Sequence, residues 1–140
     1  MADLITRLEQ DHRAIIEHLD AIRAAGFSRE VAIRQLRLAK GLIVGHLAEE
    51  DRSLYQPMLT HPTAAATARL FQERMQPITA EVLAFFARYD VERGFEPDAA
   101  FSQDLGALTQ KLRSRVRQEE ERLYPLYRQT LATGASPIRQ

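Results

Sequence analysis

The sequence predicts an all-α protein, an antiparallel up-down four-helix bundle, on three observations. Apolar residues recur at steps of three and four along almost the whole chain, which is the spacing of a helix that buries one face. The predicted helices are separated by short segments that contain glycine or proline. The alternating pattern of a strand is almost absent. Four amphipathic helices with short connections are typical of this bundle.

The first two helices are predicted from their end signals and apolar stripes. Asp3 is a suitable N-cap for the first helix and Gly26 a suitable stop, while Ser28 can cap the second. Pro57 and Pro62 bound the expected exit of the second helix. The two stripes consist of Leu8, His12, Ile15, Leu19 and Ile22, then Leu36, Ala39, Ile43, His46, Glu50 and Leu54.

The third and fourth helices follow the same pattern. The third follows an alanine-rich start at Thr63, and Pro77 inside it removes one backbone hydrogen bond and predicts a kink. The fourth runs from about Asp98, and Pro125 is expected to break or kink it. We therefore expect one domain over residues 1–132 and a flexible tail over 133–140. The stripes are Phe71, Met75, Ile78, Val82, Phe85 and Tyr89, then Phe101, Leu105, Leu108, Leu112, Arg115, Glu119 and Leu123.

Composition excludes several classes of site and partner. The chain of 140 residues has no cysteine, so thiolate metal sites and disulfides are ruled out. Basic and acidic residues both number 19, which argues against broad attraction to nucleic acid or to an anionic membrane. No apolar run is long enough to span a bilayer, and the N-terminus has no secretory signal pattern. We expect a cytoplasmic protein with no nucleic-acid or membrane partner.

The chain contains a hidden duplication. When the second helix is laid on the fourth, His46 falls on Arg115, Glu50 on Glu119 and Tyr55 on Tyr124. The first helix matches the third in the same way, with His12 on Met75 and Ile15 on Ile78. The sequence therefore predicts two helical hairpins related by an approximate two-fold axis. The polar residues at core positions are His12, His46 and Glu50 in the first hairpin, and Arg115 and Glu119 in the second.

These polar residues are candidate metal ligands. His46 and Glu50 are one turn apart, so both side chains point from one helical face into the same volume. His12 lies on the facing stripe of the first helix, and Glu119 can add a fourth ligand. Two imidazoles with carboxylates suit a divalent transition metal such as iron, zinc or manganese. Met75 is interpreted as core filling rather than as a soft ligand.

Three segments resemble the hemerythrin-like family, also called HHE cation-binding domains. They are DHRAI, HLAEEDRSLYQP and RVRQEEERLYP, at 11–15, 46–57 and 115–125, and the resemblance extends from about Leu4 to Tyr127. It implies a four-helix bundle with a non-haem di-iron centre, ligated by histidines and two bridging carboxylates.

The resemblance assigns His12, His46, Glu50 and Glu119 to one iron and the two bridges. The second iron needs histidines near Met75 and Thr79 and at the position of Arg115, and this sequence has none there. We therefore expect at most one ion, iron or another divalent metal such as zinc. The alternative is a polar core that has lost its metal.

Arg115 is predicted to take the place of the missing ion. A guanidinium cannot ligate a cation, but it can form two hydrogen bonds with a carboxylate. We therefore expect it to pair with Glu50 or Glu119 and to neutralise buried negative charge. Gly41 and Gly45, on the second helix, are expected to permit a close approach by a neighbouring helix.

The leading functional hypothesis is a metal-binding domain that senses or stores iron, oxygen or a related small molecule, or that signals. No enzymatic activity is expected, because the sequence offers no nucleophile–base pair and no phosphate loop. The alternative is a metal-free scaffold or protein-interaction module, with a protein partner or a homo-oligomer as its context. A ferritin-like carboxylate oxidase is rejected, because only Glu9 and His12 fit one of the two motifs that it needs.

Overall fold

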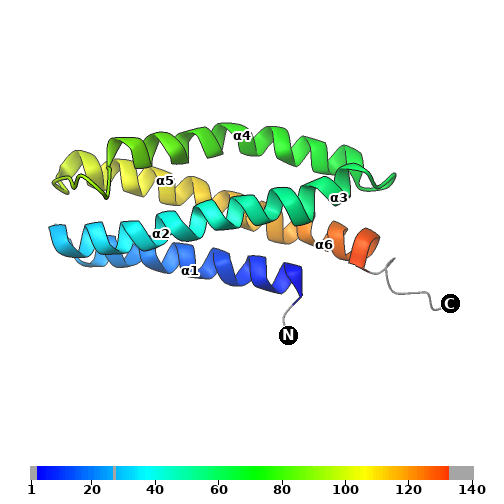
Figure 1. Ribbon diagram of the computed structural model, residues 1–140, viewed down its shortest axis with the longest axis horizontal. Helices are drawn as coiled ribbons and strands as arrows, with labels where there is room; N and C mark the ends of the chain where they lie inside the picture. Colours follow the sequence, from blue (N-terminus) through cyan, green and yellow to red (C-terminus); the bar gives the residue numbers. More distant parts are fainter. Residues whose placement is uncertain (1–2, 27, 133–140) are drawn as a thin grey trace.

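A computed structural model of the chain describes residues 3–26 and 28–132. In these residues the regular structure is entirely helical, as the sequence predicts. Four helical rods run antiparallel, and both chain ends leave from the same end of the bundle (Figure 1). The tail expected at 133–140 lies outside the described residues.

The first and third rods are single helices, whereas the second and fourth are composite. The first is α1 (Leu4–Ala24) and the third is α4 (Ala65–Arg88). The second consists of α2 (Arg29–Glu49), a π-helical segment η1 (Glu50–Tyr55) and α3 (Gln56–Leu59). The fourth consists of α5 (Ala99–Gln118), the π-helical η2 (Glu119–Leu123), α6 (Tyr124–Tyr127) and η3 (Arg128–Ala132).

Side-chain caps fix three helix starts, two of them, at Asp3 and Ser28, as predicted. The side chains of Asp3, Ser28 and Asp98 each accept a hydrogen bond from the backbone N–H three residues later, at 2.8, 3.3 and 2.9 Å. Each bond satisfies one of the N–H groups that a helix start leaves without a partner. Gly26 has a φ of 67°, the left-handed conformation in which glycine ends a helix without strain.

The second rod ends at Leu59, so its exit lies between Pro57 and Pro62 as predicted. Pro125 does not break the fourth rod, which continues to Ala132. Pro57 and Pro125 both lie within a continuing rod. Ahead of each proline the backbone N–H bonds to the carbonyl five residues earlier, which makes one wide turn. Each proline then lies in the first turn of a new helical segment, where its missing N–H is tolerated. The wide turns begin at Glu50 and Glu119, two of the predicted ligands.

Pro77 lies inside α4 without ending it. The helix is continuous from Ala65 to Arg88. Figure 1 shows this rod bowed along its length. Proline has no backbone N–H, so the helix lacks one of its i to i−4 hydrogen bonds at Pro77. Bending of the helix is the ordinary response to that loss.

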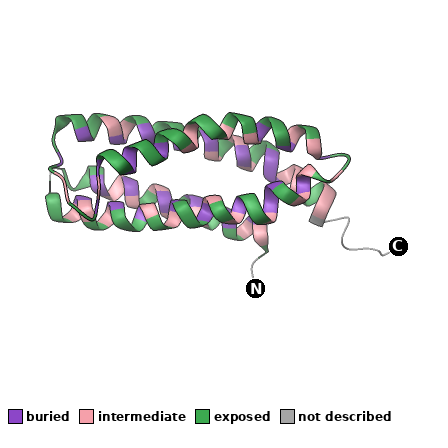
Figure 2. Cartoon of the chain, turned by 45° about the horizontal axis from the view of Figure 1, so that its top comes forward, coloured by how far each residue is buried: buried purple, intermediate pink, exposed green. Residues whose placement is uncertain are grey.

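The core consists of two apolar clusters with a polar layer between them. Buried residues line the inner side of all four rods (Figure 2). Leu19, Leu36 and Phe101 belong to the larger cluster, and Leu8 and Leu54 to the cluster nearer the chain ends. None of the described helices is both long enough and apolar enough to cross a membrane. The buried residues of the polar layer are His12, His46, Glu50, Arg115 and Glu119.

Candidate metal centre

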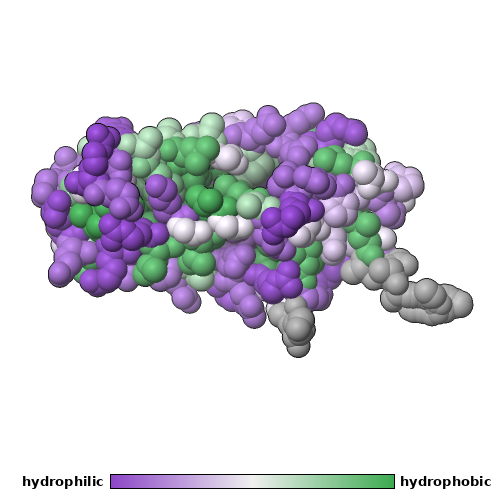
Figure 3. Space-filling view, in the orientation of Figure 1, coloured by the Kyte–Doolittle hydropathy of each residue, from purple (hydrophilic) through white to green (hydrophobic). Residues whose placement is uncertain are grey.

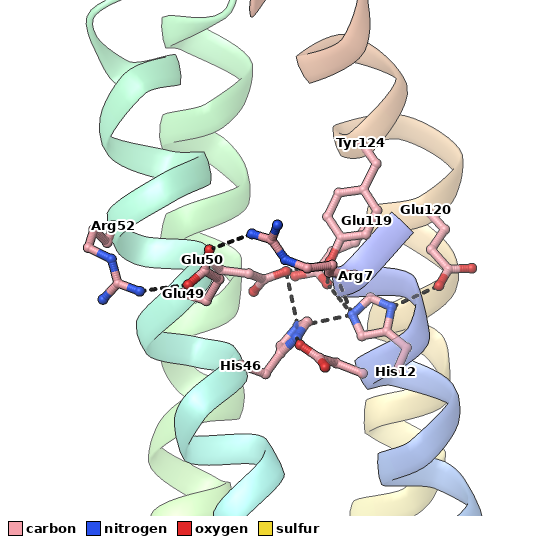
Figure 4. A network of polar contacts seen from close by, with 10 residues as sticks. Arg7, His12, His46, Glu49, Glu50, Arg52, Glu119, Glu120 and Tyr124 are labelled. Atoms are coloured by element: carbon pink, nitrogen blue, oxygen red, sulfur yellow. Dashed lines mark hydrogen bonds and ion pairs between the residues drawn. The ribbon is translucent and has the colours of Figure 1, made fainter. Parts of the chain in front are cut away.

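The four predicted ligands meet in the polar layer. His12 comes from α1, His46 from α2, Glu50 from the start of η1 and Glu119 from the start of η2. One ligand atom of each lies within 4.8 Å of those of the other three. All four side chains are at least 94% buried. Figure 4 shows them converging on a common point, with His46 and Glu50 from the second rod, His12 from the first and Glu119 from the fourth.

The two histidines present the same ring nitrogen to the site. The Nδ1–H of His12 donates to Glu120 at 2.8 Å, and that of His46 donates to Asp11 at 3.1 Å. These bonds fix the ring orientations and leave both Nε2 atoms facing inward, 3.1 Å apart. Two nitrogen lone pairs this close repel, so the pair requires a proton or another cation between them.

Each carboxylate has one oxygen engaged and one oxygen without a partner. Glu50 Oε2 lies 3.2 Å from His46 Nε2, and Glu119 Oε1 lies 3.2 Å from His12 Nε2. The Tyr124 hydroxyl donates to Glu50 Oε2 at 2.6 Å. The second oxygens, Glu50 Oε1 and Glu119 Oε2, are buried and have no hydrogen-bond partner among the described residues. Such buried acceptors are costly unless a cation satisfies them.

Charges inside the layer shift several pKa values. Burial alone lowers the pKa of His46, but the hydrogen bond and charge of Glu50 outweigh it and raise the value to about 9. Burial and the negative charge of Glu50 raise the pKa of Glu119 to about 7. Burial raises the pKa of the Tyr124 hydroxyl far above its usual range, with help from the same carboxylates, so it stays a donor. The layer therefore favours an added positive charge.

The arrangement fits a divalent transition metal. Ligand atoms about 2.1 Å from an ion lie about 3.0–3.4 Å from one another in octahedral or tetrahedral geometry. The separations of 3.1 and 3.2 Å between the facing atoms match this range. Imidazole and carboxylate donors together suit iron, zinc and manganese. The residues present can therefore hold one ion, and its charge would satisfy the two carboxylate oxygens that lack partners.

Comparison with known proteins agrees with this geometry. The family model described as Hemerythrin HHE cation binding domain matches residues 3–127. The chain belongs to the hemerythrin HHE family. Searches of the curated proteins and of the solved structures gave no significant match.

This hemerythrin-family bundle departs from its own symmetry in the second hairpin. Met75 and Arg115 stand where the first hairpin has His12 and His46. Beside them lies a cavity of about 30 Å³, room for one or two water molecules, which His12, His46 and Glu119 also line. The second hairpin thus keeps a carboxylate and a small space but offers no imidazole.

The expected pairing of Arg115 with Glu50 or Glu119 is wrong. Its guanidinium points to α4, where it donates to the Phe71 carbonyl at 3.0 Å and to the Met75 sulfur at 3.3 Å. It also lies over the Phe71 ring, 4.8 Å from the centroid. The guanidinium also donates to Gln118 Oε1, one turn along its own helix, at 3.1 Å. Its hydrogen bonds within the described residues therefore go to α4 and to its own helix rather than to Glu50 or Glu119.

Three supporting residues of the HHE site were not identified from the sequence. Asp11 and Glu120 orient the two histidines, and the Tyr124 hydroxyl donates to Glu50. Each carboxylate orients a histidine on a different rod: Glu120 on the fourth rod orients His12, and Asp11 on the first rod orients His46. A signal was present, since Asp11 adjoins His12 and Glu120 adjoins Glu119, both predicted ligands.

Proposed function

We propose that this hemerythrin-family domain binds one divalent metal ion, iron or zinc, through His12, His46, Glu50 and Glu119. The observation that carries the proposal is the pair of Nε2 atoms, 3.1 Å apart, each oriented by a carboxylate on its other nitrogen. Histidines that ligate metals are commonly held in this way, and the outer carboxylate strengthens the ligand. The unpartnered oxygens of Glu50 and Glu119 complete the donor set.

A single ion is proposed because the second hairpin cannot hold another. Arg115 is permanently protonated, so it offers no lone pair and repels a nearby cation. Met75 offers only a thioether, a soft donor that divalent iron and zinc bind weakly. Glu119 is the one potential ligand of that hairpin in the polar layer, and the first hairpin already uses it.

The proposed role is sensing, storage or signalling in the cytoplasm rather than oxygen transport by a di-iron pair. A bound iron supplies a redox couple and a bound zinc a Lewis acid. The protein's own part is to orient two imidazoles, hold two carboxylates and keep bulk water from a site whose ligands are at least 94% buried. We propose no catalytic activity, since no nucleophile–base pair adjoins the cavity.

The test is metal content. The protein is purified without chelator or a nickel column, reconstituted in turn with iron, zinc and manganese, and analysed for metal per chain alongside its optical spectrum. We expect about one ion per chain and its loss in His46→Ala. His61→Ala is the matched control, because His61 lies in the loop after α3 and is outside the cluster.

Other results would overturn the proposal. Two irons per chain with oxo-bridge absorption would show that the second hairpin binds metal after all. No binding of any of the three metals would favour the alternative, a metal-free helical scaffold. The feature that favours this alternative is Arg115, a buried cation in place of a ligand.

A further inference from the structure

The outward face of α2 and the groove between α4 and α5 differ in what they offer a ligand. Apolar residues gather in the middle of the face over α2 and α4 in Figure 3. A Cβ atom built at Gly41 or Gly45 of α2 would have no described atom within 4 Å, apart from its own helix and chain neighbours. The expectation that these glycines receive a neighbouring helix of the bundle is therefore wrong. The groove between α4 and α5, by contrast, brings charged side chains of two helices together.

This α4–α5 groove has an excess of positive charge. Its volume is about 370 Å³, and Ile78 is the one apolar residue among the described residues that line it. Three of the lining residues are cations, Arg74, Lys111 and Arg115, and one is a carboxylate, Glu81. Lys111 forms an ion pair with Glu81 of the opposite helix, whereas Arg74 is exposed and has no ion-pair partner among the described residues. Two positive charges therefore remain, on Arg74 and Arg115.

Arg115 is a buried cation without a counter-ion. It is 4% exposed, and no carboxylate of the described residues forms an ion pair with it. Its hydrogen-bond acceptors are neutral: the Phe71 carbonyl, the Met75 sulfur and the Gln118 side-chain oxygen. Buried charges in proteins are normally paired, because an unpaired charge loses its hydration without compensation. An anion in the adjoining groove would supply the missing charge.

Gln118 occupies the place beside Arg115 that an anion would take. It lines the groove half-buried, and its Oε1 accepts from Arg115 Nη1 at 3.1 Å while its Nε2 donates to the Ser114 hydroxyl at 3.5 Å. An amide oxygen is neutral, so an anionic oxygen forms the stronger hydrogen bond with a guanidinium. Rotation of the Gln118 side chain would leave Arg115 Nη1 and the Ser114 hydroxyl free to donate into the groove.

We propose that the α4–α5 groove binds a phosphate dianion, with Arg115 at its base, Arg74 at its mouth and Ser114 donating from its hydroxyl. The two uncompensated positive charges match the charge of this ligand, and a guanidinium can donate two parallel hydrogen bonds to a phosphate. The ligand is inorganic phosphate or the terminal phosphate of a small molecule, which share this chemistry. None of the four proposed metal ligands is among the described residues that line the groove, so the site is independent of the metal centre.

Isothermal titration calorimetry of the full chain with inorganic phosphate, at low ionic strength, tests the proposal. We expect saturable binding of one phosphate per chain. Arg74→Gln should weaken this binding about tenfold or more, because it removes one of the two charges that face the ligand. Arg69→Gln is the matched control, since Arg69 is an exposed arginine of the same helix that does not line the groove.

Gln118→Glu is the sharper test, because it builds the missing counter-ion into the protein. The new carboxylate should pair with Arg115, abolish phosphate binding and raise the melting temperature in phosphate-free buffer. Gln110→Glu adds the same charge at an exposed position of α5 outside the groove, so it should leave phosphate binding unchanged.

Glycerol phosphate separates the two sources of the ligand. Tighter binding than that of inorganic phosphate assigns the groove to a phosphate ester, and equal or weaker binding assigns it to the free ion; each result supports the proposal. No saturation below about 10 mM phosphate, equal loss in Arg69→Gln, or unchanged binding in Gln118→Glu would overturn it. Circular dichroism checks that each variant keeps its helices.

Discussion

The two hairpins share an order of helical elements and differ in their chemistry. Both have a long helix that enters a wide π turn, and both place a glutamate at the start of that turn. The first hairpin places the imidazoles of His12 and His46 beside its glutamate. The second has the thioether of Met75 and the guanidinium of Arg115 at the equivalent positions. A duplicated backbone therefore conserves the geometry of a site without conserving its ligands.

The two hairpins also differ in the hydrogen bonding of Tyr55 and Tyr124, the tyrosines that follow Glu50 and Glu119. Tyr124 crosses to the first hairpin and bonds to Glu50 at 2.6 Å. Its counterpart, Tyr55, lies near Arg115, and its buried hydroxyl has no hydrogen-bond partner among the described residues. Glu50 in the first hairpin therefore accepts a hydrogen bond from the tyrosine of the second hairpin, whereas Tyr55 supports no carboxylate in return.

Copying the second hairpin into the first should have the largest effect. His12→Met places a thioether where the proposed site has an imidazole, and we expect metal content to fall from about one ion per chain to nearly none. Equilibrium dialysis with zinc and with iron measures the change. Met75→Leu, the counterpart control, should keep the ion. Unchanged affinity in His12→Met would show that the ion lies elsewhere.

The reverse exchange should create a second site. Met75→His, Thr79→His and Arg115→His together supply imidazoles around the cavity of about 30 Å³ and remove the fixed positive charge. We expect metal content to rise toward two ions per chain, measured by elemental analysis. The same triple variant with His46→Ala separates the halves, since it should retain only the new ion. A content that stays at one would mean that the second hairpin differs in backbone as well as ligands.

The orienting carboxylates should have a smaller effect. Glu120→Gln weakens the hydrogen bond that holds His12, and losses of this kind reduce metal affinity about 10–100-fold. Asp51→Asn is its counterpart, because Asp51 aligns with Glu120 but orients no histidine. We expect unchanged affinity there by competition with a chromogenic chelator. Equal effects in the two variants would contradict the proposed asymmetry.

The tyrosines should differ in their effect on stability. Tyr124→Phe removes the donor to a buried carboxylate and should lower the unfolding free energy by about 1.5–3 kcal/mol. Tyr55→Phe removes a buried hydroxyl without a partner, so stability should stay within about 0.5 kcal/mol or rise. Urea unfolding of the chelator-treated protein measures both. A larger loss in Tyr55→Phe would show that its hydroxyl has a partner in solution.

The fold and the four converging residues were predictable because they follow from local periodicity. His46 and Glu50 are four residues apart, so they lie on one face of an α-helix. Caps such as Ser28 also act within a single turn. The direction of Arg115 was not predictable, because it depends on contacts with Phe71 and Met75, which lie on a different helix. The continuation of the fourth rod past Pro125 was not predictable, because a wide turn leaves the spacing of the preceding stripe unchanged.

A π turn is equivalent to an α-helix that has gained one residue, and each residue rotates a helix by about 100°. The turns at Glu50 and Glu119 therefore set the phase between the two apolar clusters. Met58, a buried member of the chain-end cluster, and Leu126, which packs against it, lie beyond these turns. Deleting one residue from either turn would leave a good helix but would direct the following tyrosine away from the layer.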